Sequence, residues 1–167
     1  VTFYEPMNEP HQWVNLNRNS DDSFCYCPAT KATYRQWLQN KYETIDALND
    51  AWGVFYNDFS QIHPPRWCAT YIESIEFRKF TMENIAKEVA FRVGIIKQCD
   101  DKPVIAHAWG GGMIGCSNLG SMAFDDWKNA QMVDKWGFSA FPRSDEDCCM
   151  LALGCNGTRC AAGDKDY

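Results

Sequence analysis

Three short apolar segments of this sequence each end in residues that could take part in chemistry. Asn8-Glu9-Pro10 follows the first segment, His107-Ala108-Trp109 closes the second, and Ser139-Ala140-Phe141-Pro142 closes the third. A carboxylate can act as general acid and base on a glycosidic oxygen, and aromatic faces can stack on the apolar side of a sugar ring. Together these side chains suit the cleavage of a sugar.

The elements that must position these residues alternate between short strands and helices. We expect strands at residues 1–4, 104–108 and 137–142, a loop at 11–24, helices at 31–42, 44–52, 67–97, 123–136 and 145–153, and a loop from Gly154 onward. Alternation of this kind is typical of a parallel sheet with right-handed crossovers, whose reactive groups gather at the carboxyl ends of the strands. The fold class is therefore α/β, either a barrel or an open sheet.

One partial domain, residues 1–167, is expected, with a long helical insertion at about 25–100 after the first strand. Within the insertion, Thr44 is expected to cap a helix that stops at Gly53. Three strands cannot close a barrel. The strand pattern of the first segment is already present at Val1. The sequence therefore predicts an internal piece of a larger domain.

The motifs resemble a known family. Asn8-Glu9-Pro10 resembles the fourth-strand signature of the clan of retaining (β/α)8-barrel glycosidases. The residues that follow it are similar, in order and spacing over about 60 residues, to glycoside hydrolase family 42 β-galactosidases. The similar segments are Cys25-Tyr26-Cys27, 34–42, 44–53 and Ile62-His63-Pro64-Pro65. Residues 126–142 match the fifth and sixth barrel strands of the family more loosely.

The resemblance implies part of a TIM (β/α)8 barrel, about strands 4 to 6, from an enzyme that hydrolyses terminal β-D-galactosides. Glu9 would be the acid/base, and Asn8 would contact the sugar 2-hydroxyl. The nucleophile would lie at the end of the seventh strand, outside this chain, so the isolated chain is expected to be inactive. Asp126, Asp134 and the cluster 145–147 are predicted to fall on helices or helix starts, which makes them poor replacements.

Further substrate contacts are expected from His107, Trp109 and Phe141, which end the second and third strands. Each has a structural alternative. The histidine could be satisfied within the barrel, and large aromatic residues near barrel tops are often core.

No cofactor is expected. Some members of the family bind a structural zinc through a cysteine cluster, of which only Cys25 and Cys27 match, with Thr30 at the third position. Two thiolates are too few for a tetrahedral zinc site. The nine cysteines are expected to be mostly buried free thiols, with a disulfide among Cys148, Cys149, Cys155 and Cys160 as the alternative.

Composition excludes several partners. The net charge of −6 provides no basic surface for nucleic acid, and no apolar run approaches the roughly 20 residues that cross a bilayer. The resemblance implies a homo-oligomer, such as a trimer, in the cytoplasm. Three other functions stay open: another retaining glycosidase of the clan, such as an arabinopyranosidase, a non-catalytic carbohydrate-binding barrel, and a cysteine-rich metal-binding module.

Overall fold

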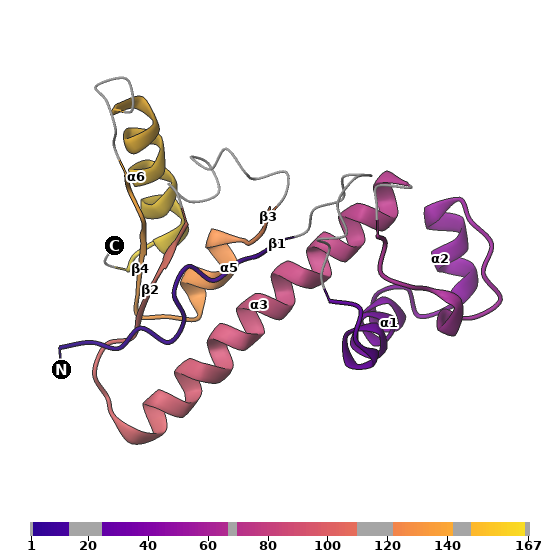
Figure 1. Cartoon of the computed structure of the whole chain (residues 1–167), viewed down its shortest axis with the longest axis horizontal. Coiled ribbons are helices and arrows are strands. Elements are labelled where there is room, and N and C mark those ends of the chain that lie inside the picture. The colour runs from indigo at the N-terminus through magenta and orange to yellow at the C-terminus, as the bar shows by residue number, and fades with distance from the viewer. Residues whose placement is uncertain (1, 14–24, 67–69, 110–121, 142–147, 166–167) are drawn as a thin grey trace. The chain divides into compact units, whose positions relative to one another are not determined.

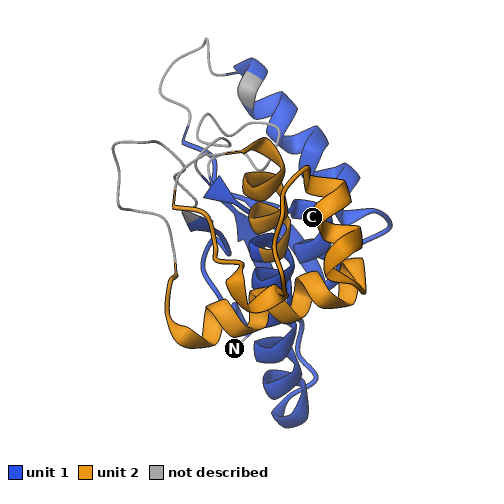
Figure 2. Cartoon of the chain, turned by 90° about the vertical axis from the view of Figure 1, so that its right-hand side faces the viewer, with its two compact units in different colours: residues 1–12, 81–167 blue, residues 13–80 orange. Residues whose placement is uncertain are grey.

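The computed structural model describes residues 2–13, 25–66, 70–109, 122–141 and 148–165 (Figure 1). The chain forms two compact units (Figure 2). The strand unit comprises Val1–Gln12 and Thr81–Tyr167, and the helical unit comprises Trp13–Phe80. The long helix α3 (Tyr71–Cys99) contributes residues to both.

Parallel pairing brings together the three segments that carry the candidate residues. Strand β2 (Ile105–Ala108) pairs in parallel with β4 (Lys135–Phe138), with Ala106 opposite Trp136 and His107 opposite Gly137. On the other edge of β2, Tyr4 forms a parallel bridge to Val104. The three segments thus lie in the order first, second, third, as consecutive strands of a parallel sheet do.

Two of the predicted strands differ from the observed ones. The strand expected at 1–4 is reduced to the single bridge at Tyr4, whose amide donates to Pro103 O at 2.9 Å and whose carbonyl accepts from Ile105 N at 2.8 Å. Strand β4 begins at Lys135, inside the stretch predicted as helix, because its backbone is paired with β2. Sheet pairing has overridden a helical pattern here.

The helix predicted at 123–136 is also shorter than expected. Met122–Ala123 forms strand β3, which pairs with β1 (Gln12–Trp13) in a second two-stranded sheet. Helix α5 (Asp126–Gln131) starts only after these residues, where the Asp125 side chain accepts from Lys128 N as its N-cap.

The last helix extends well beyond its prediction. Helix α6 spans Cys148–Ala162, so the loop expected from Gly154 onward is wrong, while residues 145–147 lie outside the described residues. Gly154 and Gly157 are buried in this helix, which packs against α5 and β4. Burial against these neighbours offsets the poor helix propensity of glycine, and the helix ends at Gly163, where φ is +66°.

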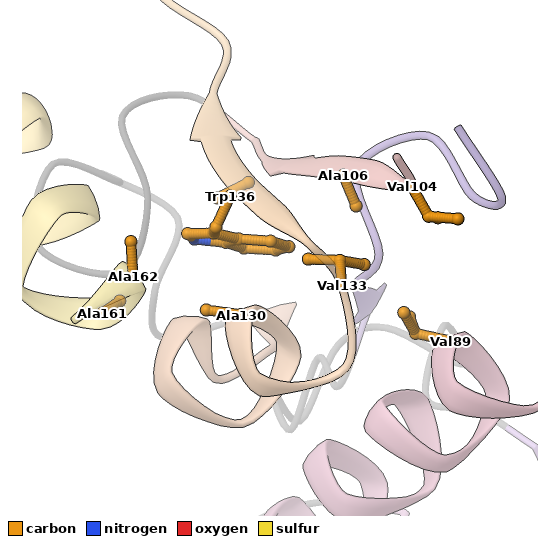
Figure 3. Close-up of a cluster of buried hydrophobic side chains, with 9 residues drawn as sticks. Val89, Val104, Ala106, Ala130, Val133, Trp136, Ala161 and Ala162 are labelled. Carbon is orange, nitrogen blue, oxygen red and sulfur yellow. The ribbon is translucent and has the colours of Figure 1, made fainter. Parts of the chain in front are cut away.

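The core of the strand unit lies between the strands and their helices (Figure 3). Ala106, Ala108 and Trp136 face the helices, and they meet Val89 of α3 and Ala162 of α6. Because successive side chains of a strand point to opposite faces, burial of these three residues turns their neighbours in β2 and β4 toward the other face. That opposite face carries the candidate site.

The helical unit contains α1 (Pro28–Tyr42), α2 (Ile45–Trp52), the short helix η1 (Phe59–Gln61) and the start of α3. The prediction for α2 is confirmed, since Thr44 accepts from Ala47 N and Gly53 ends the helix with φ of +66°. Tyr34 of α1 packs edge-on against Phe77 of α3, with ring centroids 5.3 Å apart. No helix within the described ranges combines the length and apolar composition needed to cross a bilayer.

Candidate active site

The Glu9 carboxylate and the Ser139 hydroxyl form the central contact of the site. Ser139 directly follows β4, and its Oγ donates to Glu9 Oε1 at 2.7 Å. In β4 the side chain of Trp136 enters the core, so alternation places Gly137 and Ser139 on the opposite face. The structure therefore brings Glu9 to the carboxyl end of the third parallel segment.

The backbone at Glu9 has an uncommon conformation. Its φ is +45°, in the left-handed region that residues with a Cβ rarely adopt. Two contacts hold the neighbouring backbone: His11 Nδ1 lies 2.5 Å from Glu9 O, and Asn129 Nδ2 donates to Pro10 O at 3.3 Å. Such conformations cost of order 1–3 kcal/mol and cluster at active sites. The turn thus fixes the direction in which Glu9 leaves the chain.

A second polar pair lies on the same face of the strands. His107 Nδ1 is 2.7 Å from Glu5 Oε1, and both side chains are about one-third exposed. A Cβ added at Gly137, opposite in the register, would lie 3.6 Å from His107 Cβ. With Nδ1 held by Glu5, the Nε2 edge of the ring is the one available to a ligand.

The other sequence-predicted residues lie around these pairs without joining them. Trp109 is half-buried, packs against Met122 and Phe124, and lies 6.5 Å from His11 between ring centroids. Asn8 is exposed, and Phe141 is 71% exposed. The structure brings Glu9 to Ser139 and His107 to Glu5, whereas Asn8 and Phe141 are left open to solvent.

Two residues of this site have no assigned role in the sequence-based prediction. Ser139 appears there only as part of a strand end, and Glu5 lies just after the first expected strand, at 1–4, with no role given to it. A usable signal exists for both, because each is polar and adjoins a parallel segment at the rim where reactive groups gather. The pairings themselves depend on register, which the sequence does not show.

The acidic residues that the sequence offered as replacement nucleophiles do not join this site where the structure describes them. The prediction that Asp134 lies on a helix or helix start is wrong, because this residue precedes β4. There it accepts from Val104 N at 2.8 Å and pairs with Lys97 at 2.8 Å. Asp126 is 1% exposed within α5. The predicted cluster at 145–147 lies outside the described residues.

The cysteines that the structure describes are not gathered into a metal-binding group. Cys27 caps α1, where its Sγ accepts from Thr30 N at 3.4 Å, and Cys25 lies two residues before it in the sequence. No group of three or more His, Cys, Asp or Glu side chains in the described ranges could hold a metal ion. The donor set, two thiols and a threonine, does not fit the four good ligands that structural zinc requires.

The thiols also differ from their predicted burial. The described cysteines are all free and exposed, so the expectation of mostly buried thiols is wrong for Cys25, Cys27, Cys99, Cys148, Cys149, Cys155 and Cys160. Hydrogen bonds from the Thr30 side chain and backbone lower the pKa of Cys27 to about 7. Its position at a helix N-terminus favours the thiolate in the same direction.

The sequence of this chain is similar to one family of glycoside hydrolases. The β-galactosidase model of glycoside hydrolase family 42 matches residues 12–166, a range that begins three residues after Glu9. The chain is 28% identical over 126 residues to a β-galactosidase of Haloferax lucentense, covering 71% of the chain and 18% of that protein. It is 31% identical over 97 residues to a β-galactosidase of Geobacillus kaustophilus, covering 53% and 14%. The chain thus spans less than a fifth of these relatives.

Solved structures give the same fold. An exo-carrageenase of Bacteroides ovatus superposes with a TM-score of 0.74 at 21% identity, over 95% of this chain and 24% of that one. Such neighbours are TIM-barrel glycosidases, and the parallel segments ending at Tyr4, Ala108 and Phe138 correspond to part of a barrel sheet. The prediction of an α/β chain forming part of a (β/α)8 barrel is confirmed.

Proposed function

Because this chain belongs to the β-galactosidase family of glycoside hydrolases, we propose that it carries the acid/base half of the catalytic centre of a retaining β-galactosidase. Glu9 is the acid/base. The contact that carries this proposal is the 2.7 Å hydrogen bond from Ser139 Oγ to Glu9 Oε1, which holds a carboxylate at the strand ends of a partial barrel. Active sites of this fold lie at that end.

The hydrogen bond assigns different tasks to the two carboxyl oxygens. Oε1 accepts from Ser139, while Oε2 makes no hydrogen bond within the described part of the chain. In the first step Oε2 delivers a proton to the leaving glycosidic oxygen, as the sugar is transferred to a nucleophilic carboxylate. In the second step the deprotonated Glu9 activates water, which hydrolyses the glycosyl ester.

The nucleophile is assigned to a part of the whole enzyme outside these 167 residues. Retention requires a second carboxylate about 5 to 5.5 Å from the acid/base. Asp134 is paired with Lys97, Asp126 is buried in α5, and Glu5 is held by His107. The chain alone is therefore expected to show no glycosidase turnover.

The substrate is proposed to be a terminal β-D-galactoside. Asn8 adjoins Glu9 and can reach the sugar 2-hydroxyl, while His107 offers its Nε2 edge, and Trp109 and Phe141 offer aromatic faces. An aromatic side chain that is exposed or half-buried next to a catalytic carboxylate is available for stacking on a sugar. The two β-galactosidases to which the chain is similar support galactose as the sugar.

A homotrimer and a cytoplasmic location complete the proposal. Both are suggested by the family resemblance. The free state of all described cysteines suits a reducing compartment. Light scattering of the complete enzyme measures its mass, and fractionation of its source cells measures its location.

The experiment uses the complete enzyme that contains this chain, with lactose, nitrophenyl β-D-galactoside and nitrophenyl α-L-arabinopyranoside as substrates. We expect faster hydrolysis of the galactoside, with the β-anomer of galactose as the first product by NMR. Glu9→Gln should lower kcat/KM for lactose by about 100-fold or more. Glu43→Gln is the matched control, because Glu43 also has a positive φ, of 63°, but is exposed at the end of α1.

Three results would contradict the proposal. Full activity of Glu9→Gln would show that Glu9 is not the acid/base. An α-anomeric first product would show that the enzyme inverts the anomeric configuration. Absence of hydrolysis with intact sugar binding would identify a non-catalytic barrel instead. Preference for the arabinopyranoside would correct the sugar and leave the role of Glu9 in place.

A further inference from the structure

Asn129 of α5 makes a buried hydrogen bond to the turn that carries Glu9. Its Nδ2 donates to Pro10 O at 3.3 Å, although the two residues are 119 positions apart in the sequence. The side chain of Asn129 is enclosed, and the residue is only 1% exposed. A buried main-chain carbonyl needs a hydrogen-bond donor, and at Pro10 a side chain from a helix supplies it.

The turn at Glu9 needs support from outside its own sequence. Glu9 has φ of +45°, a conformation that a residue with a Cβ rarely adopts. Pro10 restricts it further, because a proline ring disfavours helical conformations of the residue before it. A backbone in such a conformation persists only where its surroundings determine it. The hydrogen bond from Asn129 to the following carbonyl is a constraint of this kind.

The backbone of Asn129 is itself fixed. Asn129 N donates to Asp125 O at 2.9 Å, and Met132 N donates to Asn129 O at 3.0 Å. The next residue, Ala130, is 1% exposed in the core of the strand unit (Figure 3). The amide therefore reaches Pro10 from a part of α5 that is held by main-chain hydrogen bonds and by core packing.

The amide of Asn129 serves as a donor. Nδ2 must face Pro10 O, because the reverse orientation would bring two acceptors together. Oδ1 is then buried without a hydrogen-bond partner among the described residues. A buried acceptor of this kind destabilises a fold, and an apolar side chain would avoid the cost. Within the described part of the chain, the donation to Pro10 is what an asparagine contributes here.

One helix and the strand that follows it support Glu9 at two points. Asn129 lies on α5, and Ser139 directly follows β4, the next element along the chain. The helix residue holds the main chain at Pro10, and the strand residue holds Glu9 Oε1 at 2.7 Å. A general acid needs both its position and its direction fixed, since it delivers a proton over hydrogen-bonding distance.

We propose that Asn129 is a positioning residue for acid/base catalysis, which holds the Glu9 turn through the Pro10 carbonyl. The inference rests on the function proposed for Glu9. Asn129 does not contact the sugar in this account, and it acts only through the direction of the Glu9 side chain. Its loss should therefore lower kcat and change KM little, because proton transfer is impaired while sugar binding is kept.

The leaving-group dependence of Asn129→Asp in the complete enzyme tests this inference. The new side chain keeps the shape of asparagine, but its ionised form can only accept hydrogen bonds. With aryl β-D-galactosides, the loss of kcat/KM should be about tenfold larger for a leaving group of high pKa than for one of low pKa, since only the former depends on the proton from Glu9. The comparison of two substrates in one preparation is independent of how much of the variant is folded.

Asn49→Asp is the matched control. Asn49 is also a buried asparagine on a helix, and its Nδ2 donates to Tyr56 O at 2.9 Å within the helical unit. A smaller amount of folded enzyme lowers the measured rate for every substrate by the same factor. Any loss in this variant should therefore be equal for good and poor leaving groups.

The pH dependence gives a second readout. A protonated aspartic acid can donate to Pro10 O, and burial raises the pKa of a carboxyl group. The kcat/KM of Asn129→Asp relative to the unmodified enzyme should therefore rise as pH falls. Asn129→Ala has no donor at any pH and should show no such recovery. The same pH dependence in both variants would overturn the inference.

Glu9→Ala, assayed with the same substrates, separates the two proposals. An equal loss for all leaving groups in Asn129→Asp, beside a steep dependence in Glu9→Ala, would overturn the role of Asn129 and leave Glu9 as the acid/base. An equal loss for all leaving groups in Glu9→Ala would overturn the function proposed for Glu9, and the positioning role with it.

Discussion

The hydroxyl of Ser139 donates to Glu9 Oε1 across 2.7 Å and joins two segments that are 130 residues apart in the chain. The contact links the turn after the first parallel segment to the residue that follows β4. It exists only because β2 lies between them, bridged to Tyr4 on one side and paired with β4 on the other. The sheet order therefore brings Ser139 within hydrogen-bonding distance of Glu9.

Ser139→Ala in the complete enzyme should lower kcat about tenfold, because the carboxylate loses the hydrogen bond that orients it within the described part of the chain. KM should change little, since Ser139 positions Glu9 and does not bind the sugar in this account. Ser139→Thr retains a hydroxyl and should recover most of kcat. Ser60→Ala, at an exposed serine of η1, is the control. An effect on KM alone would show that Ser139 contacts substrate instead.

Glu5→Gln and His107→Gln should each raise KM for a β-galactoside, because Glu5 holds the imidazole through the 2.7 Å contact at Nδ1. The loss of binding free energy in the double variant should be smaller than the sum of the losses in the two single variants, because each single variant already breaks the same Glu5–His107 contact. A coupling free energy of about 0.5–3 kcal/mol is expected for residues in direct contact. Additive effects in this double-mutant cycle would show that Glu5 does not act through His107.

Much of this arrangement is readable from local sequence, and the failures have identifiable causes. Thr44 and Gly53 predict α2 because caps act within one turn. The helix expected through Trp136 fails because β2 pairs with that segment, and the loop expected after Gly154 fails because α6 is buried against α5 and β4. Glu9 stands out through its motif, whereas the Glu9–Ser139 and Glu5–His107 pairs require the register of strands distant in sequence. Pairing and burial are tertiary effects that local patterns do not encode.

Cys27 should react with iodoacetamide at neutral pH. Its pKa is lowered to about 7 by the hydrogen bonds from Thr30, so the thiolate is half-formed near pH 7 and the rate should rise through that pH and level off above it. Thr30→Val removes the side-chain hydrogen bond and should move the midpoint to higher pH. Thr33→Val, at an exposed position of the same helix, is the control. Peptide mass spectrometry measures the rate, and an unchanged midpoint in Thr30→Val would contradict the stated cause.

Gly53→Ala and Gly94→Ala should change stability in opposite directions. Both glycines have open space where a Cβ would lie, but Gly53 has φ of +66° and Gly94 lies within α3. The left-handed conformation should cost the Gly53 variant about 1–2 kcal/mol, and Gly53→Asn should cost less. Helix propensity should stabilise Gly94→Ala by about 0.5–1 kcal/mol. Urea denaturation measures both, and equal shifts of the two alanine variants would refute the role assigned to φ.

The central claim, that Glu9 is the acid/base, is tested most directly by the dependence of Glu9→Ala on the leaving group and on azide. The complete enzyme should be assayed with a series of aryl β-D-galactosides of increasing leaving-group pKa. We predict that the variant's loss of kcat/KM grows steeply along the series, because poor leaving groups need the proton that Glu9 donates. Added azide should restore turnover with good leaving groups and yield β-galactosyl azide. A uniform loss across the series, with no azide product, would contradict the account.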